Sequence, residues 1–182
     1  LGPRENLWSR RTSAQSMTAI RAFVKKARIL GIDPGTKRIG FALSDELGWT
    51  AQPLETYERR TLPQDLAHIN TLVCEYGVGQ VVLGCPYLDD GSVGPAAKVV
   101  LEFKAKLEEC VSIPVITWDE TMTTSQAQDL LIEANMSRKR RKGTIDRVAA
   151  ALILRSYLDH CANETSAAQA LSSLGEDSDR DL

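Results

Sequence analysis

The sequence predicts an α/β fold, in which a mixed β-sheet is flanked by helices. Three short extended patterns come first, and helical patterns then alternate with two further extended runs. Strands joined by short turns pair antiparallel, whereas strands separated by a helix pair in parallel. The composition supports an ordinary globular domain, because 43% of the 182 residues are hydrophobic and 25% are charged.

The first three strands are expected at residues 28–33, 39–43 and 51–57. The first is a short apolar run, and in the second large and small residues alternate with the period of a strand. Between them lies a turn with Pro34 and Gly35, residue types that favour a hairpin. This segment therefore predicts an antiparallel meander of three strands.

The remainder of the domain alternates between helix and strand. Apolar residues at steps of three and four predict amphipathic helices, and β-branched runs predict buried strands. The helices are expected at about 62–76, 99–110, 123–134 and 144–158, and the strands at 80–84 and 114–119. Together with the meander, these elements give a mixed sheet with helices packed on its faces.

The two ends of the chain differ from its middle in charge. Residues 1–30 carry seven basic side chains and one acid, whereas residues 162–182 carry five acids and one arginine. We therefore expect a flexible basic extension in residues 1–26, one domain in residues 27–161 and a disordered acidic tail in residues 162–182.

The N-terminal extension permits two interpretations. It contains arginine and serine and few acids, as organellar transit peptides do, and it also fits an over-extended reading frame whose true start is Met17. The second interpretation is preferred. The expected location is therefore the cytoplasm, with an organelle as the alternative.

The composition argues against several classes of protein. The longest uncharged apolar stretches, such as residues 81–88, fall far short of the roughly 20 residues that cross a bilayer, so no membrane partner is expected. The four cysteines form no CxxC pair and the two histidines are far apart in sequence, which argues against structural zinc. Separated cysteines with apolar neighbours are typical of reduced core residues.

Acidic residues stand where expected strands end or where the last helix begins. They are Asp33 at the end of the first strand, Asp119 and Glu120 at the end of the fifth, and Asp146 in the first turn of the last helix. Ligands of such sheets collect outside the strand ends. The alanines at 149–150, one turn further along, would let the helix approach the sheet closely. Three of the acids could then meet.

Each acid also has a purely structural explanation. The helix macrodipole would favour Asp146 by about 0.3–1 kcal/mol, with Thr144 as the N-cap. Asp119 or Glu120 could belong to the cap of the helix expected after them. Asp33 is the acid for which a purely structural explanation is weakest. Its carboxylate follows the apolar segment LGI and would lose hydration, which is unfavourable unless another group stabilises the charge.

Divalent cations would compensate such a cluster. Carboxylates brought together raise one another's pKa unless cations neutralise them. Hard cations prefer oxygen ligands, so Mg²⁺ or Mn²⁺ fits a site without histidine or cysteine. Two such ions about 4 Å apart activate a water molecule and stabilise the leaving oxygen in phosphodiester hydrolysis.

Four segments carry a resemblance to a known family. They are ILGIDPGTKRIGFALSD at 29–45, LGCPYLDDGS at 83–92, WDETMTT at 118–124 and TIDRVAAALIL at 144–154. In this order and at these separations they resemble the YqgF family of RNase H-like proteins, described as Holliday junction resolvases or pre-16S ribosomal RNA nucleases. The resemblance covers about residues 28–158.

The resemblance implies a five-stranded RNase H-like sheet, with three antiparallel and then two parallel strands, and a metal-dependent endonuclease. It implies that Asp33, Glu120 and Asp146 are the catalytic residues and the ligands of two Mg²⁺ or Mn²⁺ ions. The implied function is maturation of the 5′ end of pre-16S rRNA, Holliday junction resolution, or both. Two departures put substrate contacts in question: Thr121 stands where the family has arginine, and Cys85 where it has leucine.

Basic residues close to these acids are candidates for binding nucleic acid. Five consecutive cations between two expected helices could form a solvated loop, but they lead directly into the helix that carries Asp146. The expected phosphate-binding residues are Lys37, Arg38, Arg138, Lys139, Arg140, Arg141 and Lys142. Aromatic residues make up 5% of the chain and form no stacking motif, which favours binding through backbone charge and shape.

Two other functions stay open. One is a non-catalytic nucleic-acid-binding factor of the same fold, which Thr121 favours and the three acids oppose. The other is a fragment of an actin-like phosphate-binding ATPase, because IDPGTK resembles the first phosphate hairpin of that superfamily, although 182 residues are too few for its two domains. The expected partner is nucleic acid, either pre-rRNA or branched DNA. The sequence leaves a homodimer open.

Overall fold

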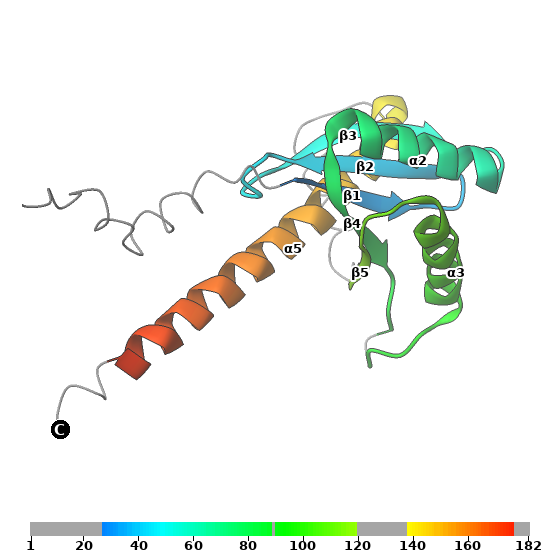
Figure 1. Cartoon of the computed structure of the whole chain (residues 1–182). Helices are drawn as coiled ribbons and strands as arrows, with labels where there is room; N and C mark the ends of the chain where they lie inside the picture. The colour runs from blue at the N-terminus through cyan, green and yellow to red at the C-terminus, as the bar shows by residue number, and fades with distance from the viewer. Residues whose placement is uncertain (1–26, 89, 120–137, 177–182) are drawn as a thin grey trace, which may run out of the picture.

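Helices cover both faces of the central sheet (Figure 1). The structure, a computed structural model, describes residues 27–88, 90–119 and 138–176. The strands are β1 (Arg28–Pro34), β2 (Arg38–Ser44), β3 (Ala51–Glu58), β4 (Val78–Cys85) and β5 (Val115–Asp119), and the helices are α2 (Leu62–Tyr76), α3 (Pro95–Cys110) and α5 (Arg138–Glu176).

The sheet is mixed and has the strand order β3-β2-β1-β4-β5. The pairs β1–β2 and β2–β3 are antiparallel, whereas β1–β4 and β4–β5 are parallel. This confirms the α/β fold with a five-stranded sheet, three strands antiparallel and then two parallel.

Alternation along the strands separates two hydrophobic cores. On one face, residues such as Leu30, Ile32 and Phe41 pack with side chains of α2 and α3. On the other face, Ala42 and Val82 pack with side chains of α5. Because successive strand residues point to opposite faces, the same strands contribute to both cores.

Local signals fix both ends of α2. Pro63 lies in its first turn, where a missing N–H costs no helical hydrogen bond. Thr61 precedes the helix, and Oε1 of Gln64 accepts hydrogen bonds from the Thr61 backbone N at 3.4 Å and Oγ1 at 3.1 Å. Gly77 ends it with φ at 62°, a left-handed conformation that glycine adopts readily.

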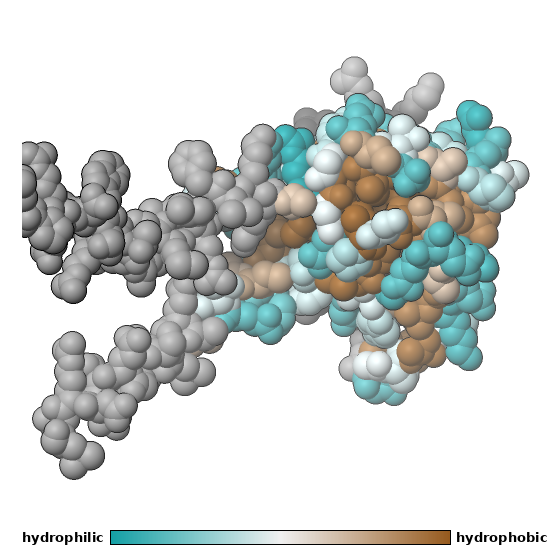
Figure 2. Space-filling view, viewed as in Figure 1, coloured by the Kyte–Doolittle hydropathy of each residue, from teal (hydrophilic) through white to brown (hydrophobic). Residues whose placement is uncertain are grey.

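Apolar side chains also reach the surface, between α2 and α3, where Figure 2 shows them on the visible face. Two cavities of about 520 and 550 Å³ lie there, and Leu62 lines both. Leu62 and Val99 are 40% and 60% exposed. The seam between the two helices is therefore partly open to solvent.

Helix α5 lies close to the other face because small residues line the crossing. A Cβ atom added to Gly31 would be 2.8 Å from Cβ of Leu154 and 3.0 Å from the carbonyl oxygen of Ala150. Ala149 and Ala150 are both buried. This confirms the close approach that the two alanines predict.

The bounds of α5 differ from the sequence-based prediction at both ends. The helix begins at Arg138 instead of Thr144, and it continues to Glu176, through most of the segment expected to be a disordered tail. A side-chain contact between residues four positions apart reaches into this part of the helix, with Nε2 of His160 3.3 Å from Oε1 of Glu164. Beyond the sheet, α5 projects from the domain (Figure 1).

The structure also tests the expectations for the cysteines and for membrane spans. None of the four cysteines forms a disulfide, but only Cys85 is buried, whereas Cys74 and Cys110 are exposed, so the expectation of four core cysteines is wrong. In the described part of the chain, no helix is long and apolar enough to span a bilayer. The helix expected at 123–134 and the extension at 1–26 lie outside the described residues.

Candidate active site

Asp33 and Asp146 are brought together at Gly40. Asp33 is the register partner of Gly40 across β1 and β2. A Cβ atom added to Gly40 would overlap the carbonyl group of Asp146, so the backbone of α5 lies directly on β2 at this point. Alternation along β1 puts Asp33 on the same face as Gly31, which contacts α5. Two of the three predicted acids therefore lie in one region, at the end of β1.

Asp146 lies in the interior of α5, because the helix begins eight residues earlier. The expectation that Asp146 belongs to a first turn capped by Thr144 is therefore wrong. The macrodipole acts within about the first turn of a helix, so it does not explain an acid at this position.

A cation from β2 neutralises Asp146. Nε of Arg38 lies 2.7 Å from Oδ2 of Asp146, and the two side chains are 26% and 22% exposed. Although both atoms are buried, neither makes a hydrogen bond within the described structure, so the N–H is not directed at the oxygen and the contact is an ion pair. Arg38, expected to contact phosphate, is thus engaged by a site carboxylate.

β5 ends at Asp119, and alternation along the strand fixes the face to which this acid is directed. Trp118 packs in the core on the α5 face, so Asp119 is directed to the opposite face. Asp119 is therefore not placed with Asp33 and Asp146. Glu120, the residue that the family resemblance selects, lies outside the described residues, and its part in the site stays a prediction.

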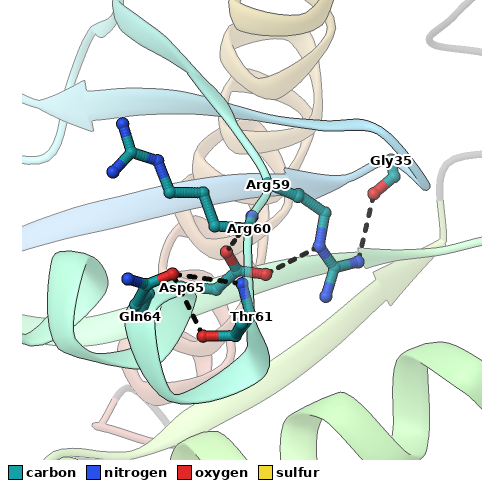
Figure 3. A network of polar contacts seen from close by, with 6 residues as sticks. All are labelled: Gly35, Arg59, Arg60, Thr61, Gln64 and Asp65. Carbon is teal, nitrogen blue, oxygen red and sulfur yellow. Dashed lines mark hydrogen bonds and ion pairs between the residues drawn. The ribbon is translucent and has the colours of Figure 1, made fainter.

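A buried ion pair holds the turn between β1 and β2 (Figure 3). The guanidinium of Arg59 donates through Nε to Oδ2 of Asp65 at 2.8 Å and through a second nitrogen to the carbonyl oxygen of Gly35 at 3.2 Å. Asp65 is 1% exposed, and its other oxygen accepts the backbone N–H of Arg60 at 3.0 Å. These contacts tie the start of α2 and the end of β3 to the turn that follows Asp33.

Arg59 and Asp65 belong to none of the motifs that the sequence shows. An acid in the first turn of a helix is normally explained by the macrodipole, and linear spacing does not show that this one is buried. One feature of the sequence could have indicated that Asp65 is buried. It directly precedes Leu66, on the buried side of an amphipathic helix. A buried acid needs a partner, and the nearest arginines precede the helix.

We expect Asp65→Ala to lower the free energy of unfolding by about 3 kcal/mol, because it leaves the partly buried guanidinium of Arg59 without its partner. Thermal unfolding followed by circular dichroism measures this change. The matched control is Asp159→Ala, which breaks an exposed pair on α5 and should cost less than about 1 kcal/mol. Equal losses in the two variants would show that the Arg59–Asp65 pair does not stabilise the turn.

The run of five cations forms the beginning of α5 and is not a loop, contrary to expectation. Lysine and arginine are good helix formers, and the apolar part of α5 that packs on the sheet stabilises the turns before it. The side chains of Arg138, Lys139, Arg140, Arg141 and Lys142 lie outside the described structure, so their contact with nucleic acid stays a prediction. Lys37 is exposed in the β1–β2 turn.

The described residues contain no group of three histidine, cysteine or acidic side chains that could hold a metal ion. With Glu120 outside them, the described part of the site consists of Asp33 and Asp146. Carboxylate oxygens are ligands that Mg²⁺ and Mn²⁺ prefer. The buried Oδ2 of Asp146, which makes no hydrogen bond, already attracts a cation, so these residues fit a divalent metal.

The sheet order β3-β2-β1-β4-β5, with helices on both faces, is that of an RNase H-like fold. Residues 27–160 match the family model described as "RuvX: Holliday junction resolvase". The chain belongs to this family, which is also called YqgF, and the resemblance found in the sequence is thereby confirmed. Divalent metal use is typical of the family.

Curated relatives support the same assignment. A protein of Moorella thermoacetica, named "Putative pre-16S rRNA nuclease", is 52% identical over 132 residues, which cover 72% of this chain and 94% of the relative. A protein of Halalkalibacterium halodurans with the same name is 48% identical over 134 residues, covering 72% and 96%. A solved structure described as "T. thermophilus RuvC in complex with Holliday junction substrate" has a TM-score of 0.46 and 15% identity, covering 72% of this chain and 93% of that one.

Proposed function

We propose that this chain is a divalent-metal-dependent endonuclease that cleaves the backbone of structured nucleic acid, with the 5′ end of pre-16S rRNA as its natural substrate. The observation that carries the proposal is the meeting of Asp33 and Asp146 on the α5 face beside Gly40. The names of the curated relatives support the RNA substrate, and the name of the family model supports a Holliday junction as the second candidate.

The two acids would hold the metal, with Glu120 as the third ligand, and two Mg²⁺ or Mn²⁺ ions are proposed. A bound metal pair would lower the pKa of a water molecule and neutralise charge on the leaving oxygen. Asp33 is suited to ligation because β1, a central strand, fixes its position. Asp146 is suited because its backbone is pressed against β2, so its carboxylate has little freedom to move away.

Arg38 has two tasks in this proposal. It offsets the negative charge of Asp146 through the 2.7 Å ion pair. A metal at Asp146 would supply that positive charge instead. The guanidinium of Arg38 would then be free for a phosphate oxygen, the role that the sequence predicts for it.

The test compares cleavage of a four-way DNA junction with cleavage of a pre-16S rRNA fragment that carries its 5′ extension. Both reactions contain Mn²⁺, and parallel reactions contain EDTA. Metal-dependent cleavage of the RNA at a defined position supports the proposal, and cleavage of the junction alone would assign the second substrate. Binding of both without cleavage of either would favour a non-catalytic factor of the same fold.

A further inference from the structure

A basic cavity lies beside the candidate active site, between the β1–β2 turn and the end of β3. Its volume is about 730 Å³, and cations outnumber carboxylates in its lining. The cations are Lys37, Arg38, Arg59 and Arg60, the carboxylates are Glu58 and Asp65, and Thr36 and Leu62 complete the lining. No aromatic side chain is among these residues, so the cavity offers charge without a surface for base stacking.

Two of the four cations are already neutralised by carboxylates. Arg38 pairs with Asp146 at 2.7 Å, and Arg59 pairs with the buried Asp65 at 2.8 Å. The guanidinium of Arg59 also donates to a backbone carbonyl of the turn and lies 5.2 Å from the ring centre of Phe103. As long as these ion pairs persist, Arg38 and Arg59 shape the cavity and are not its free charges.

Lys37 and Arg60 are the remaining cations of the cavity. Both are exposed, and neither forms an ion pair with a described residue. In Figure 3, the side chain of Arg60 points away from the contact between Arg59 and Asp65. The remaining carboxylate, Glu58, is the register partner of Arg38 across β2 and β3.

The backbones that carry these two cations are held in place. The carbonyl oxygen of Lys37 accepts the N–H of Arg59 at 3.0 Å, and the N–H of Arg60 donates to the buried carboxylate of Asp65 at 3.0 Å. The N-terminus of α2 also borders the cavity through Leu62, and its dipole favours a negative charge there. The arrangement is therefore a fixed frame with two free positive charges.

We propose that the cavity is a subsite for a backbone phosphate of the nucleic acid, bound by Lys37 and Arg60. The inference rests on the proposed nuclease function and adds to it the path of the bound strand. Arg38 lines the cavity and touches Asp146, so a strand that reaches the acids meets the cavity next. Because its ligand is a phosphate, the subsite holds DNA and RNA alike and places the strand without reading its sequence.

The experiment is a salt titration of binding to the four-way junction and to the pre-rRNA fragment, with the full chain and Ca²⁺ in place of the catalytic metal. The test protein carries Lys37→Ala and Arg60→Ala together. Its charge-matched control carries Lys98→Ala and Arg155→Ala, which remove two exposed cations from α3 and α5. Thermal unfolding of both proteins verifies that they are folded.

For the test protein, the slope of log affinity against log salt should become shallower by about 1.4 to 1.8, which corresponds to two lost phosphate contacts. The control should keep the slope of the unchanged protein. Equal slopes in test and control proteins would overturn the subsite, whether or not the unchanged protein cleaves either substrate. Failure of cleavage in Mn²⁺ with the slope difference intact would overturn the nuclease proposal and leave the phosphate site standing.

Discussion

Replacing Asp33 by Asn is expected to abolish metal-dependent cleavage while the protein remains folded. The amide keeps the size of the side chain, but a neutral oxygen is a poorer ligand for a hard divalent cation than a carboxylate is. Asp33 is partly buried at the end of a central strand, so the substitution removes a charge without opening a cavity. The rate of cleavage in Mn²⁺ and the midpoint of thermal unfolding together measure the effect.

Asp45→Asn is the matched control for that substitution. Asp45 follows the end of β2, as Asp33 lies at the end of β1, but the antiparallel pairing puts it at the other end of the sheet. Its Oδ1 accepts the backbone N–H groups of Trp49 and Thr50 at 2.7 and 3.0 Å, and an amide oxygen can accept the same bonds. Full cleavage activity in Asp33→Asn, or an equal loss in both variants, would contradict the role given to Asp33.

Gly40→Ala is expected to disturb both stability and cleavage. The added methyl group would overlap the carbonyl group of Asp146, so α5 must shift away from β2. Overpacking of this kind costs about 1–3 kcal/mol. A displacement of about 1 Å in a catalytic group can lower a rate by about 10²-fold, so cleavage should fall even where the variant is fully folded.

The stability and the cleavage rate of Gly40→Ala are best measured below its unfolding transition and compared with those of Gly91→Ala. Gly91 has no neighbouring atom within 4 Å of an added Cβ, so Gly91→Ala introduces backbone strain at φ 77° without a clash. The control should lose some stability and keep its activity. If Gly40→Ala cleaves as fast as the control, close contact between α5 and β2 does not position the site.

The order and the type of the elements could be predicted from sequence because each carries a local signal. Examples are the alternation in β2, the three-and-four spacing in α2 and the β-branched run in β4. Each of these patterns is formed by residues that are close together in the sequence. The true extent of α5 could not be predicted, because a run of like charges and a stretch of polar residues lack an apolar face. Their helical state depends on neighbouring turns, on helix propensity and on contacts four positions apart such as His160–Glu164.

The site was predictable in part, because Asp33 stands at the end of β1, whereas Asp146 was expected at a helix start and lies in the interior of α5. Asp33 and Asp146 could be found from sequence, and their meeting follows from the small size of Gly40, Ala149 and Ala150. Pairing between distant residues left no signal in the sequence. The Arg38–Asp146 ion pair depends on the crossing of β2 by α5, which only the three-dimensional arrangement defines.

The cavity beside the site could not be predicted from the sequence either, because its residues are distant in the chain. Lys37 was visible as a basic residue of a turn, but Arg60 follows a different strand, and nothing in the linear spacing joins the two. Burial of Asp65 and its contact with Arg59 depend on how the start of α2 packs against the β1–β2 turn, which is a three-dimensional arrangement (Figure 3).

The most direct test of the central claim is a Mn²⁺ titration of the full chain, followed by electron paramagnetic resonance, without nucleic acid. The unchanged protein should bind Mn²⁺, and Asp146→Asn should weaken that binding by at least about tenfold. Removing a metal ligand should lower the Mn²⁺ affinity more than altering a residue that only contacts a ligand. Asp159→Asn, which alters an exposed acid on the same helix, should bind as the unchanged protein does. Equal Mn²⁺ affinity in all three proteins would contradict a metal site at Asp146 and, with it, the proposed mechanism of cleavage.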